Sequence, residues 1–347
     1  MRKAYSTLGR THKRIGFKIR YPEKLDRLKH VTDLNATIAE GIAELAAEQF
    51  SSLSDSPEIQ PSSADLGRTR ESLKHFVRDW SEEGAQERNR IFAPILDVLR
   101  QVDSSERSSK KVLVPGSGLG RLAWEISQLG YDTTANEFSF FMTLAFRFLL
   151  SSATTASTNQ HILRPYSHWF SHQRTNDSLF RSIAFPDAVP RLSATFHLAE
   201  QDFLTMPIPP VTKAADNSMF WSKAYASDDL GITGGYDFVV TLFFIDTAIN
   251  AFATMEHMYH LLRPGGTWIN LGPLLWTGGA QAKVELSLEE VLQAAEEIGF
   301  VIQTGDSDLN TSDVEARKTV ECEYTGDRNA MMRWIYKAEF WVARKFK

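Results

Sequence analysis

From Lys111 onward, short runs of β-branched and aromatic residues alternate with helical stretches, and this alternation restricts the fold more than any other feature. The predicted strands are Lys111–Val114, Tyr131–Asn136, Thr195–Ala199, Tyr236–Phe244 and Gly266–Leu271, with further strands near Phe300 and Phe340. The predicted helices are 122–129, 138–150, 249–262 and 288–298. Strand–helix alternation of this kind predicts an α/β fold with a mostly parallel, doubly wound sheet.

The first 100 residues have a different texture and are predicted to form a helical region. A helix is expected over about 22–50, then a Ser/Pro-rich linker over 51–63, then helix from 69 to 100 with breaks near Gly84 and Pro94. Residues 101–347 are expected to form the α/β domain. Two long polar segments near 151–190 and 205–235 interrupt its alternation, and we interpret them as inserted functional loops.

Charge and cysteine content limit the partners and the compartment. The net charge of −5 does not favour a nucleic-acid partner, although residues 1–29 carry ten Lys or Arg and two acids, which predicts a solvated basic arm. No apolar run is long enough for a membrane span.

The single cysteine, Cys322, fits a reducing compartment, so we expect the cytoplasm, with the nucleus as an alternative. The oligomeric state stays open, and a homodimer is one alternative.

A glycine turn between a predicted strand and a helix carries the clearest chemical signal. Gly116, Gly118 and Gly120 form Gly-x-Gly-x-Gly directly after Val112–Pro115, and Arg121 begins the helix. Glycines permit a sharp turn and close approach of a ligand, and the helix start offers free N–H groups. This turn therefore predicts a nucleotide-type cofactor site.

Two later acids extend this site. Glu137 ends the next strand, where a carboxylate accepts hydrogen bonds from both ribose hydroxyls. Asp202 and Phe203 follow the third strand, where an acid meets the adenine amino group. Together the series is similar to class I methyltransferases, which bind S-adenosylmethionine and release S-adenosylhomocysteine. A dinucleotide oxidoreductase is the competing class, but its motif is usually Gly-x-Gly-x-x-Gly, and position 121, where the third glycine would stand, is Arg.

No motif in the chain has the spacing of a metal site. His257 and His260 lie three residues apart in a predicted helix but lack an accompanying acid–His motif. We interpret them as exposed helix residues.

Several longer segments resemble the carnosine N-methyltransferase family, also called N2227-like. They are Phe76–Gly84, Val114–Glu125, Asn136–Met142, Phe185–Asp187, Phe243–Ala248 and Trp268–Leu275. The resemblance runs from about residue 70 to the end of the chain. It implies a Rossmann-like class I methyltransferase sheet with an N-terminal helical extension.

The resemblance also assigns roles to individual residues. It places Arg78, Gly116, Glu137 and Asp202 at cofactor positions, with His75 where the family has Gln. It places Asp246, Trp334 and Tyr336 at substrate positions, and Thr277 where the family has a substrate-contacting His. Asn270 is a further candidate substrate contact. The Thr277 departure leaves the true acceptor open.

The resemblance implies methyl transfer from S-adenosylmethionine to an imidazole nitrogen of a small acceptor, a histidine-containing dipeptide such as carnosine. Asp246 would accept the N–H of one ring nitrogen and so expose the lone pair of the other. Asp246 could equally cap the helix that follows it, which is the commoner role of Asp before a helix. Histidine in a protein, another small amine, and a non-catalytic binding protein stay open as alternatives.

Overall fold

The computed structural model describes residues 1–51, 62–210, 234–277, 281–303 and 316–346, which form two compact units. The sheet unit comprises Asn89–Ser139, Arg191–Cys322 and Tyr336–Lys347, and the helical unit comprises Met1–Arg88, Phe140–Pro190 and Glu323–Ile335. The predicted linker at 51–63 and insertion at 205–235 lie largely outside the described residues.

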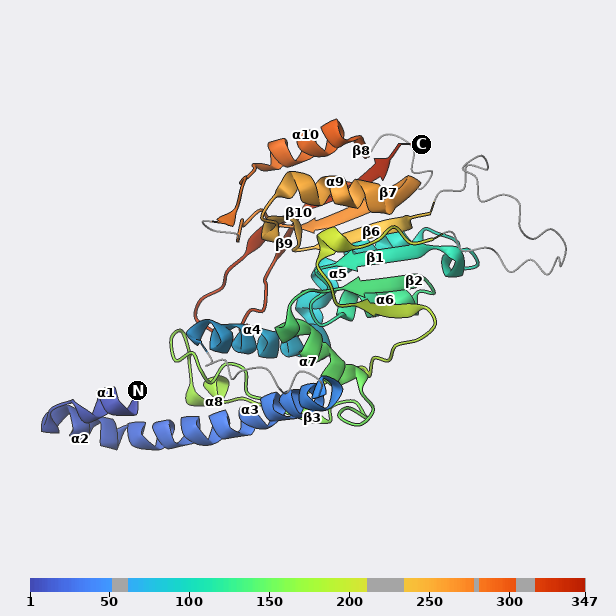
Figure 1. Cartoon of the computed structure of the whole chain (residues 1–347). Helices are drawn as coiled ribbons and strands as arrows, with labels where there is room; N and C mark the ends of the chain where they lie inside the picture. Colours follow the sequence, from blue (N-terminus) through green and yellow to red (C-terminus); the bar gives the residue numbers. More distant parts are fainter. Residues whose placement is uncertain (52–61, 211–233, 278–280, 304–315, 347) are drawn as a thin grey trace. The chain divides into compact units, whose positions relative to one another are not determined.

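An eight-stranded sheet in the order β5-β2-β1-β6-β7-β10-β8, with β9 beside β10, forms the centre of the sheet unit (Figure 1). Its strands are β1 (Lys111–Pro115), β2 (Asp132–Asn136), β5 (Phe196–Ala199), β6 (Tyr236–Leu242), β7 (Leu262–Gly272), β8 (Phe300–Ile302), β9 (Arg317–Cys322) and β10 (Tyr336–Lys345). The pairs from β5 to β7 are parallel, whereas β10 is antiparallel to β7, β8 and β9. The prediction of a mostly parallel, doubly wound α/β sheet is confirmed.

Helices pack against this sheet through their apolar faces. α6 contacts β1, β2 and β5, while α9 contacts β7 and α10 contacts both β8 and α9. The helical elements of this unit are α6 (Arg121–Gln128), α9 (Ala251–Leu261), α10 (Leu288–Ile298), most of α5 (Ala85–Arg100), and the short 3₁₀ turns η2 (Arg107–Ser109), η3 (Phe203–Thr205) and η5 (Ile245–Thr247). α6 has no side-chain hydrogen bond at its N-cap, which is Gly120. The backbone of Gly120 lies in the left-handed region.

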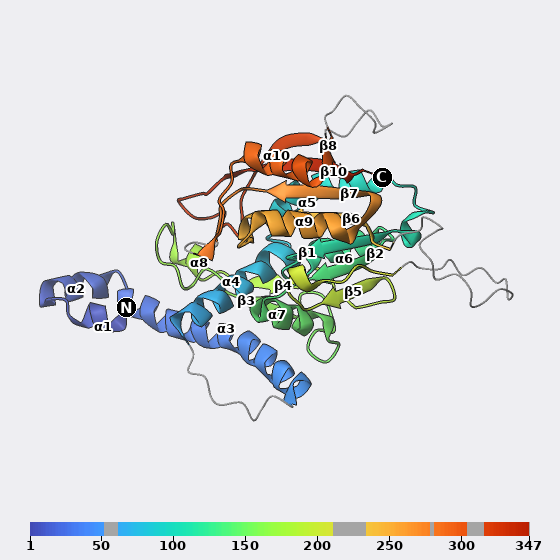
Figure 2. The same ribbon diagram turned by 45° about the horizontal axis from the view of Figure 1, so that its top comes forward.

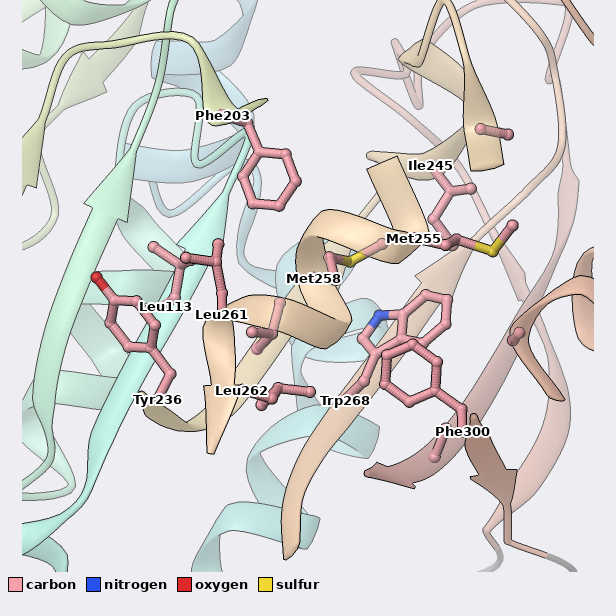
Figure 3. Packing of buried hydrophobic residues seen from close by; sticks show 14 of the residues in the cluster. Leu113, Phe203, Tyr236, Ile245, Met255, Met258, Leu261, Leu262, Trp268 and Phe300 are labelled. Atoms are coloured by element: carbon pink, nitrogen blue, oxygen red, sulfur yellow. The ribbon is translucent and has the colours of Figure 1, made fainter. Parts of the chain in front are cut away.

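The core of the sheet unit lies between β6, β7 and α9. Trp268 is fully buried, its ring packs against those of Phe300 and Trp341, and its indole N–H donates to Thr241. Figure 3 shows Trp268 and Phe300 beside Met255 and Met258 of α9. Burial of aromatic side chains on this scale stabilises a domain more than any single polar contact.

The helical unit is built around α3, α4 and α7. α3 (Tyr21–Gln49) packs against α7 (Phe140–Leu150) and β3 (His161–Leu163), and α4 (Ser63–Trp80) packs against α7 and β4 (Ile183–Phe185). α1 (Arg2–Ser6), α2 (Arg10–Lys18) and α8 (Asn176–Leu179) complete it, and Figure 2 gives a second view. β3 and β4 pair as a two-stranded antiparallel sheet inside the segment predicted to be an insertion at 151–190.

One helix prediction was wrong. Helix 69–100 does end and restart around Gly84, as α4 and α5, but α5 continues through Pro94 without a break. The prediction considered only the lost backbone N–H of proline. In the fold, Ile91, Phe92, Ile95 and Leu99 of α5 are buried, and this packing outweighs the local cost of the proline.

Candidate functional site

The glycine loop follows β1 and leads directly into α6. Gly116, Gly118 and Gly120 all have left-handed backbones, with φ of +62°, +55° and +72°. The Ser117 N–H donates to the carbonyl of Asn136 at 3.0 Å, which ties the loop to the end of β2. No heavy atom lies within 4 Å of a Cβ placed on Gly118, so the space beside this residue is open. A loop of this shape presents backbone to a ligand.

Glu137 holds the glycine loop and the end of β2 together. Its carboxylate accepts hydrogen bonds from the backbone N–H groups of Gly118 at 2.9 Å, Phe138 at 2.9 Å and Ser139 at 2.8 Å. A carboxylate has about four lone-pair directions, so these bonds leave capacity for a further donor. Glu137 is half-buried, which keeps that capacity accessible.

The segment after β5 lies at the same end of the sheet. Asn136 donates to the carbonyls of Ala199 at 3.0 Å and Gln201 at 2.8 Å, which joins the ends of β2 and β5. Asp202 is exposed, and its carboxylate accepts the Leu204 N–H at 3.0 Å. The Phe203 ring, by contrast, is buried. The carboxyl ends of β1, β2 and β5 therefore bring the predicted Gly116–Gly120, Glu137 and Asp202 together at one edge.

Arg121 turns away from this loop along α6. Its guanidinium donates to Glu125 at 2.8 Å and lies 5.2 Å above the ring of Trp124. The Arg121 side chain is buried along α6, and its contact with a cofactor stays a prediction.

The turn after β6 is bent sharply and lies over the glycine loop. Phe243 has a φ of +52°, a left-handed backbone that is strained for a residue with a Cβ. The next residue, Phe244, covers Gly116 so closely that a Cβ on this glycine would lie 2.5 Å from the ring. Gly116 is therefore required both for its backbone angle and for the approach of Phe244.

Asp246 lies in η5, just after this bend. Its side chain is buried, and one carboxylate oxygen accepts the Leu275 N–H at 3.0 Å. Burial raises the pKa of Asp246 to about 6, with the backbone hydrogen bonds acting in the opposite direction. Asp246 does not cap the helix that follows it. The N-cap of that helix, α9, is Asn250, whose side chain accepts the Ala253 N–H.

Thr277 lies directly against Asp246. Its backbone N–H donates to the Asp246 carbonyl at 3.0 Å, and its hydroxyl approaches the same oxygen at 3.4 Å. The fold thus brings together two residues for which the sequence resemblance implies substrate contact, although 31 positions separate them.

The other two candidate substrate residues of this unit have structural partners. Asn270 is 2% exposed, accepts from the Thr241 hydroxyl at 2.8 Å and donates to the Glu339 carbonyl at 3.3 Å. Tyr336 begins β10, and its ring meets that of Phe243 edge-on at 5.8 Å. Tyr336 therefore borders the bend that carries Asp246, whereas Asn270 braces the sheet interior.

The helical unit contains the other two predicted cofactor residues, His75 and Arg78, in one buried cluster. The Arg78 guanidinium donates to both oxygens of Asp79, at 2.6 and 3.2 Å, and lies 4.6 Å from the Tyr324 ring. The His75 ring nitrogens lie 3.3 Å from Asp79 and 3.4 Å from the Tyr324 hydroxyl. Burial would raise the pKa of Asp79, but the charges and hydrogen bonds of Arg78 and His75 together outweigh burial and hold that pKa low, while burial lowers the pKa of His75.

Trp334 borders a cavity of about 210 Å³ in the same helical unit. Tyr166, Trp169, Gln173, Tyr324 and Met332 also line it. The Gln173 side-chain oxygen is buried and has no hydrogen-bond partner among the described residues. Trp334 itself is 73% exposed, so its ring is available for contact.

Sequence reasoning missed the partners that orient these residues. Asp79 and Tyr324 were not among the candidates, although Asp79 lies inside the resemblance segment Phe76–Gly84. Phe244 was also missed, and the run of aromatics before Asp246 was the available signal.

Within the described ranges, no group of three or more His, Cys, Asp and Glu side chains is arranged to hold a metal ion. None of the helices in those ranges has the length and apolar character needed to cross a lipid bilayer.

The family profile and the curated relatives agree on one family. The family profile described as "Carnosine N-methyltransferase" matches residues 55–347. The carnosine N-methyltransferase of Schizosaccharomyces pombe is 34% identical over 340 aligned residues, covering 92% of this chain and 82% of that protein. The Mus musculus protein of the same name is 31% identical over 336 residues, covering 94% and 76%. Among solved structures, magnesium protoporphyrin IX methyltransferase from Synechocystis PCC 6803 aligns at 11% identity and a TM-score of 0.41, covering 81% of this chain and 95% of that one. A likeness this distant bears on neither site nor substrate.

Proposed function

This chain belongs to the carnosine N-methyltransferase family and is a methyltransferase, and we propose that it transfers the methyl group of S-adenosylmethionine to an imidazole nitrogen of a histidine-containing dipeptide such as carnosine, giving anserine. One observation carries the proposal beyond family membership. Asp246, a buried carboxylate, lies at the carboxyl end of β6, and its neighbour Phe244 covers the glycine loop that follows β1. An acceptor-binding acid beside a cofactor loop is the arrangement that this reaction needs.

The residues of the loop fit S-adenosylmethionine. The space beside Gly118 is open, and the Ser117 hydroxyl is buried with no hydrogen-bond partner among the described residues. Glu137 would accept from the ribose hydroxyls with its remaining lone pairs, and the exposed Asp202 carboxylate would accept from the adenine amino group. When bound, the cofactor supplies an electrophilic sulfonium methyl group.

Asp246 would orient the acceptor. Because its pKa is about 6, the carboxylate is mostly ionised near neutral pH. It would accept the N–H of one imidazole nitrogen, which leaves the lone pair of the other nitrogen free to attack. The same negative charge would stabilise the imidazolium that forms. Exclusion of water by Phe243, Phe244 and Tyr336 would strengthen this interaction.

The raised pKa predicts how turnover depends on pH. Protonation of Asp246 removes the acceptor for the imidazole N–H, so kcat measured at saturating carnosine should fall by up to about tenfold per pH unit below about pH 6. Above this pH, where the carboxylate is ionised, kcat should level off. Saturating acceptor keeps the protonation of free imidazole out of the profile. An acid limb that persists unchanged in Asp246→Asn would show that another group titrates.

Thr277 predicts a change in acceptor preference. The resemblance implies a histidine at this position, and Thr277 touches Asp246. Thr277→His should lower the KM for carnosine by about tenfold, the value of one added hydrogen bond. Thr277→Val is the matched control, because it keeps the backbone bond to Asp246 and removes only the hydroxyl. Equal KM values for all three proteins would place Thr277 outside the acceptor site.

The same residue favours a second candidate acceptor. Threonine is shorter than histidine and so changes the contacts available to the acceptor. The acceptors that compete with carnosine are another histidine-containing peptide, a histidine within a protein and another small amine. The family match leaves the dinucleotide oxidoreductase without support, so the open question concerns the acceptor.

One plate experiment separates these functions. Thermal stabilisation by S-adenosylhomocysteine is measured first, and carnosine, homocarnosine and other histidine dipeptides are then added with labelled S-adenosylmethionine. We expect stabilisation together with label on a dipeptide. Stabilisation without label would point to another acceptor or to a non-catalytic role. Stabilisation by a nicotinamide dinucleotide instead would overturn the cofactor.

The proposed acceptor is small, so the activity requires neither a nucleic-acid nor a membrane partner. We also propose the cytoplasm as the compartment, with the nucleus as an alternative, in keeping with a chain whose single cysteine, Cys322, is buried. Sedimentation of the purified chain would decide between monomer and homodimer.

A further inference from the structure

His257 of α9 differs from the exposed residue that its sequence spacing predicted. His260, three positions later, is exposed, but His257 is half-buried, and its ring meets the Phe203 ring edge-on with 5.0 Å between centroids. The His257 Nε2 atom is buried and has no hydrogen-bond partner among the described residues. An imidazole in this position is unusual, because a polar atom buried without a partner destabilises the fold.

A continuous row of rings connects His257 to the glycine loop. Phe203 also meets Phe244 edge-on at 5.3 Å, and Phe244 covers Gly116. Figure 3 shows the Phe203 ring directed toward α9. Phe203 immediately follows Asp202, whose carboxylate accepts the Leu204 N–H of the same short turn. The packing of Phe203 on His257 and Phe244, together with the bond from Asn136 to the Gln201 carbonyl, therefore anchors the segment that presents Asp202.

The buried position of the ring favours the neutral imidazole over the charged one. Burial lowers the pKa of His257, and the nearby His260 charge acts in the same direction. The backbone carbonyls of Phe203 and Met206 and the carboxylate of Asp202 act the other way but do not outweigh burial. A protonated imidazole is stabilised more by water than by the ring of Phe203. Protonation therefore favours a conformation in which the His257 ring leaves Phe203 and is exposed to solvent.

We propose that His257 is a positioning residue for the cofactor: its neutral, buried ring supports Phe203 and so holds Asp202 in the geometry that receives adenine, and its protonation removes that support. This inference rests on the proposed cofactor. A ligand that requires the ring-in conformation binds in proportion to the population of that conformation. Cofactor affinity is then complete at neutral and higher pH and decreases as pH falls, by up to about tenfold per pH unit.

The test measures S-adenosylhomocysteine binding by calorimetry between about pH 7.5 and pH 5.5, with no acceptor present. For the wild-type chain we expect the Kd to rise as pH falls through this range, by no more than about tenfold, because burial lowers the pKa of His257 below the ordinary imidazole value of about 6.5. His257→Phe keeps a ring against Phe203 but does not titrate, so its Kd should vary much less with pH. His260→Phe is the matched control: it removes an exposed histidine from the same helix and should keep a pH-dependent Kd, displaced only slightly toward higher pH because the His260 charge no longer lowers the pKa of His257.

The outcomes distinguish this inference from the proposed function. If the wild-type chain does not bind S-adenosylhomocysteine at neutral pH, the cofactor assignment fails. If it binds, but wild type and His257→Phe share one pH profile, the role of His257 is overturned. Should His257→Phe lower the melting temperature of the ligand-free protein strongly, His257→Gln, which is also uncharged, must show the same flattened profile. Asp246 titrates in all of these proteins, so only the difference between the profiles reports His257.

Discussion

Replacing Asp246 with alanine is expected to lower kcat for the imidazole acceptor by about 10³-fold, within the range seen for loss of a positioned acid or base. The reason is that the buried carboxylate is the proposed acceptor for the imidazole N–H and the counter-charge for the product cation. The Kd for S-adenosylhomocysteine should change by less than about threefold, because Asp246 makes its described side-chain bond to Leu275 and none to the glycine loop. Label transfer measures the first quantity and calorimetry the second.

Asp246→Asn separates charge from structure in this experiment. The asparagine oxygen still accepts the Leu275 N–H, so the segment that carries Thr277 should keep its position. If the negative charge matters, Asp246→Asn should be nearly as inactive as the alanine variant. A variant that loses cofactor binding together with turnover would contradict the assigned role and show that Asp246 supports the fold of the site.

Replacing Glu137 with alanine is expected to raise the Kd for S-adenosylhomocysteine by about 100-fold. Hydrogen bonds to a charged group contribute about 1.5–3 kcal/mol each, and loss of two ribose bonds corresponds to at least this factor. The glycine loop also loses its tie to β2, because Glu137 accepts the Gly118 N–H. Calorimetric titration of the purified variant measures the effect, and kcat at saturating cofactor should fall much less.

The glutamine variant is the control for Glu137. Its side-chain oxygen retains one acceptor for the backbone, while the charge and the second acceptor are lost. We expect an intermediate Kd and a melting temperature close to that of the wild-type protein without ligand. An unchanged Kd in Glu137→Ala would remove Glu137 from the cofactor site and leave it as a brace for the loop.

Local patterns were sufficient for the architecture of the sheet. β-branched runs and helical periodicity predicted β1, β2, β5, β6 and β7 in order, and the glycine turn predicted the left-handed backbone at 116–120. These features depend on neighbours a few residues away, so they are readable in one chain. β9 was missed because Arg317–Cys322 is charged and half-exposed, and it becomes a strand only by pairing with β10.

Several roles at the site depended on long-range contacts that no local pattern contains. Pro94 is tolerated because the faces of α5 are buried, and Asp246 does not cap α9 because the chain bends at Phe243 first. His257 is half-buried because η3 packs on it, whereas His260 on the same helix is exposed.

The sequence by itself therefore determined the family, the order of strands and helices along the chain, and the residue types available for methyl transfer. Each of these depends on residues that are close together in the sequence. Only the tertiary structure decided which of these residues meet. Strand pairing and packing bring His75 into contact with Tyr324, 249 positions away in the sequence. They also bring Asp246 into contact with Thr277, 31 positions away. Burial then sets the chemistry, since the same aspartate has an ordinary pKa in water and one of about 6 where the fold removes water from it.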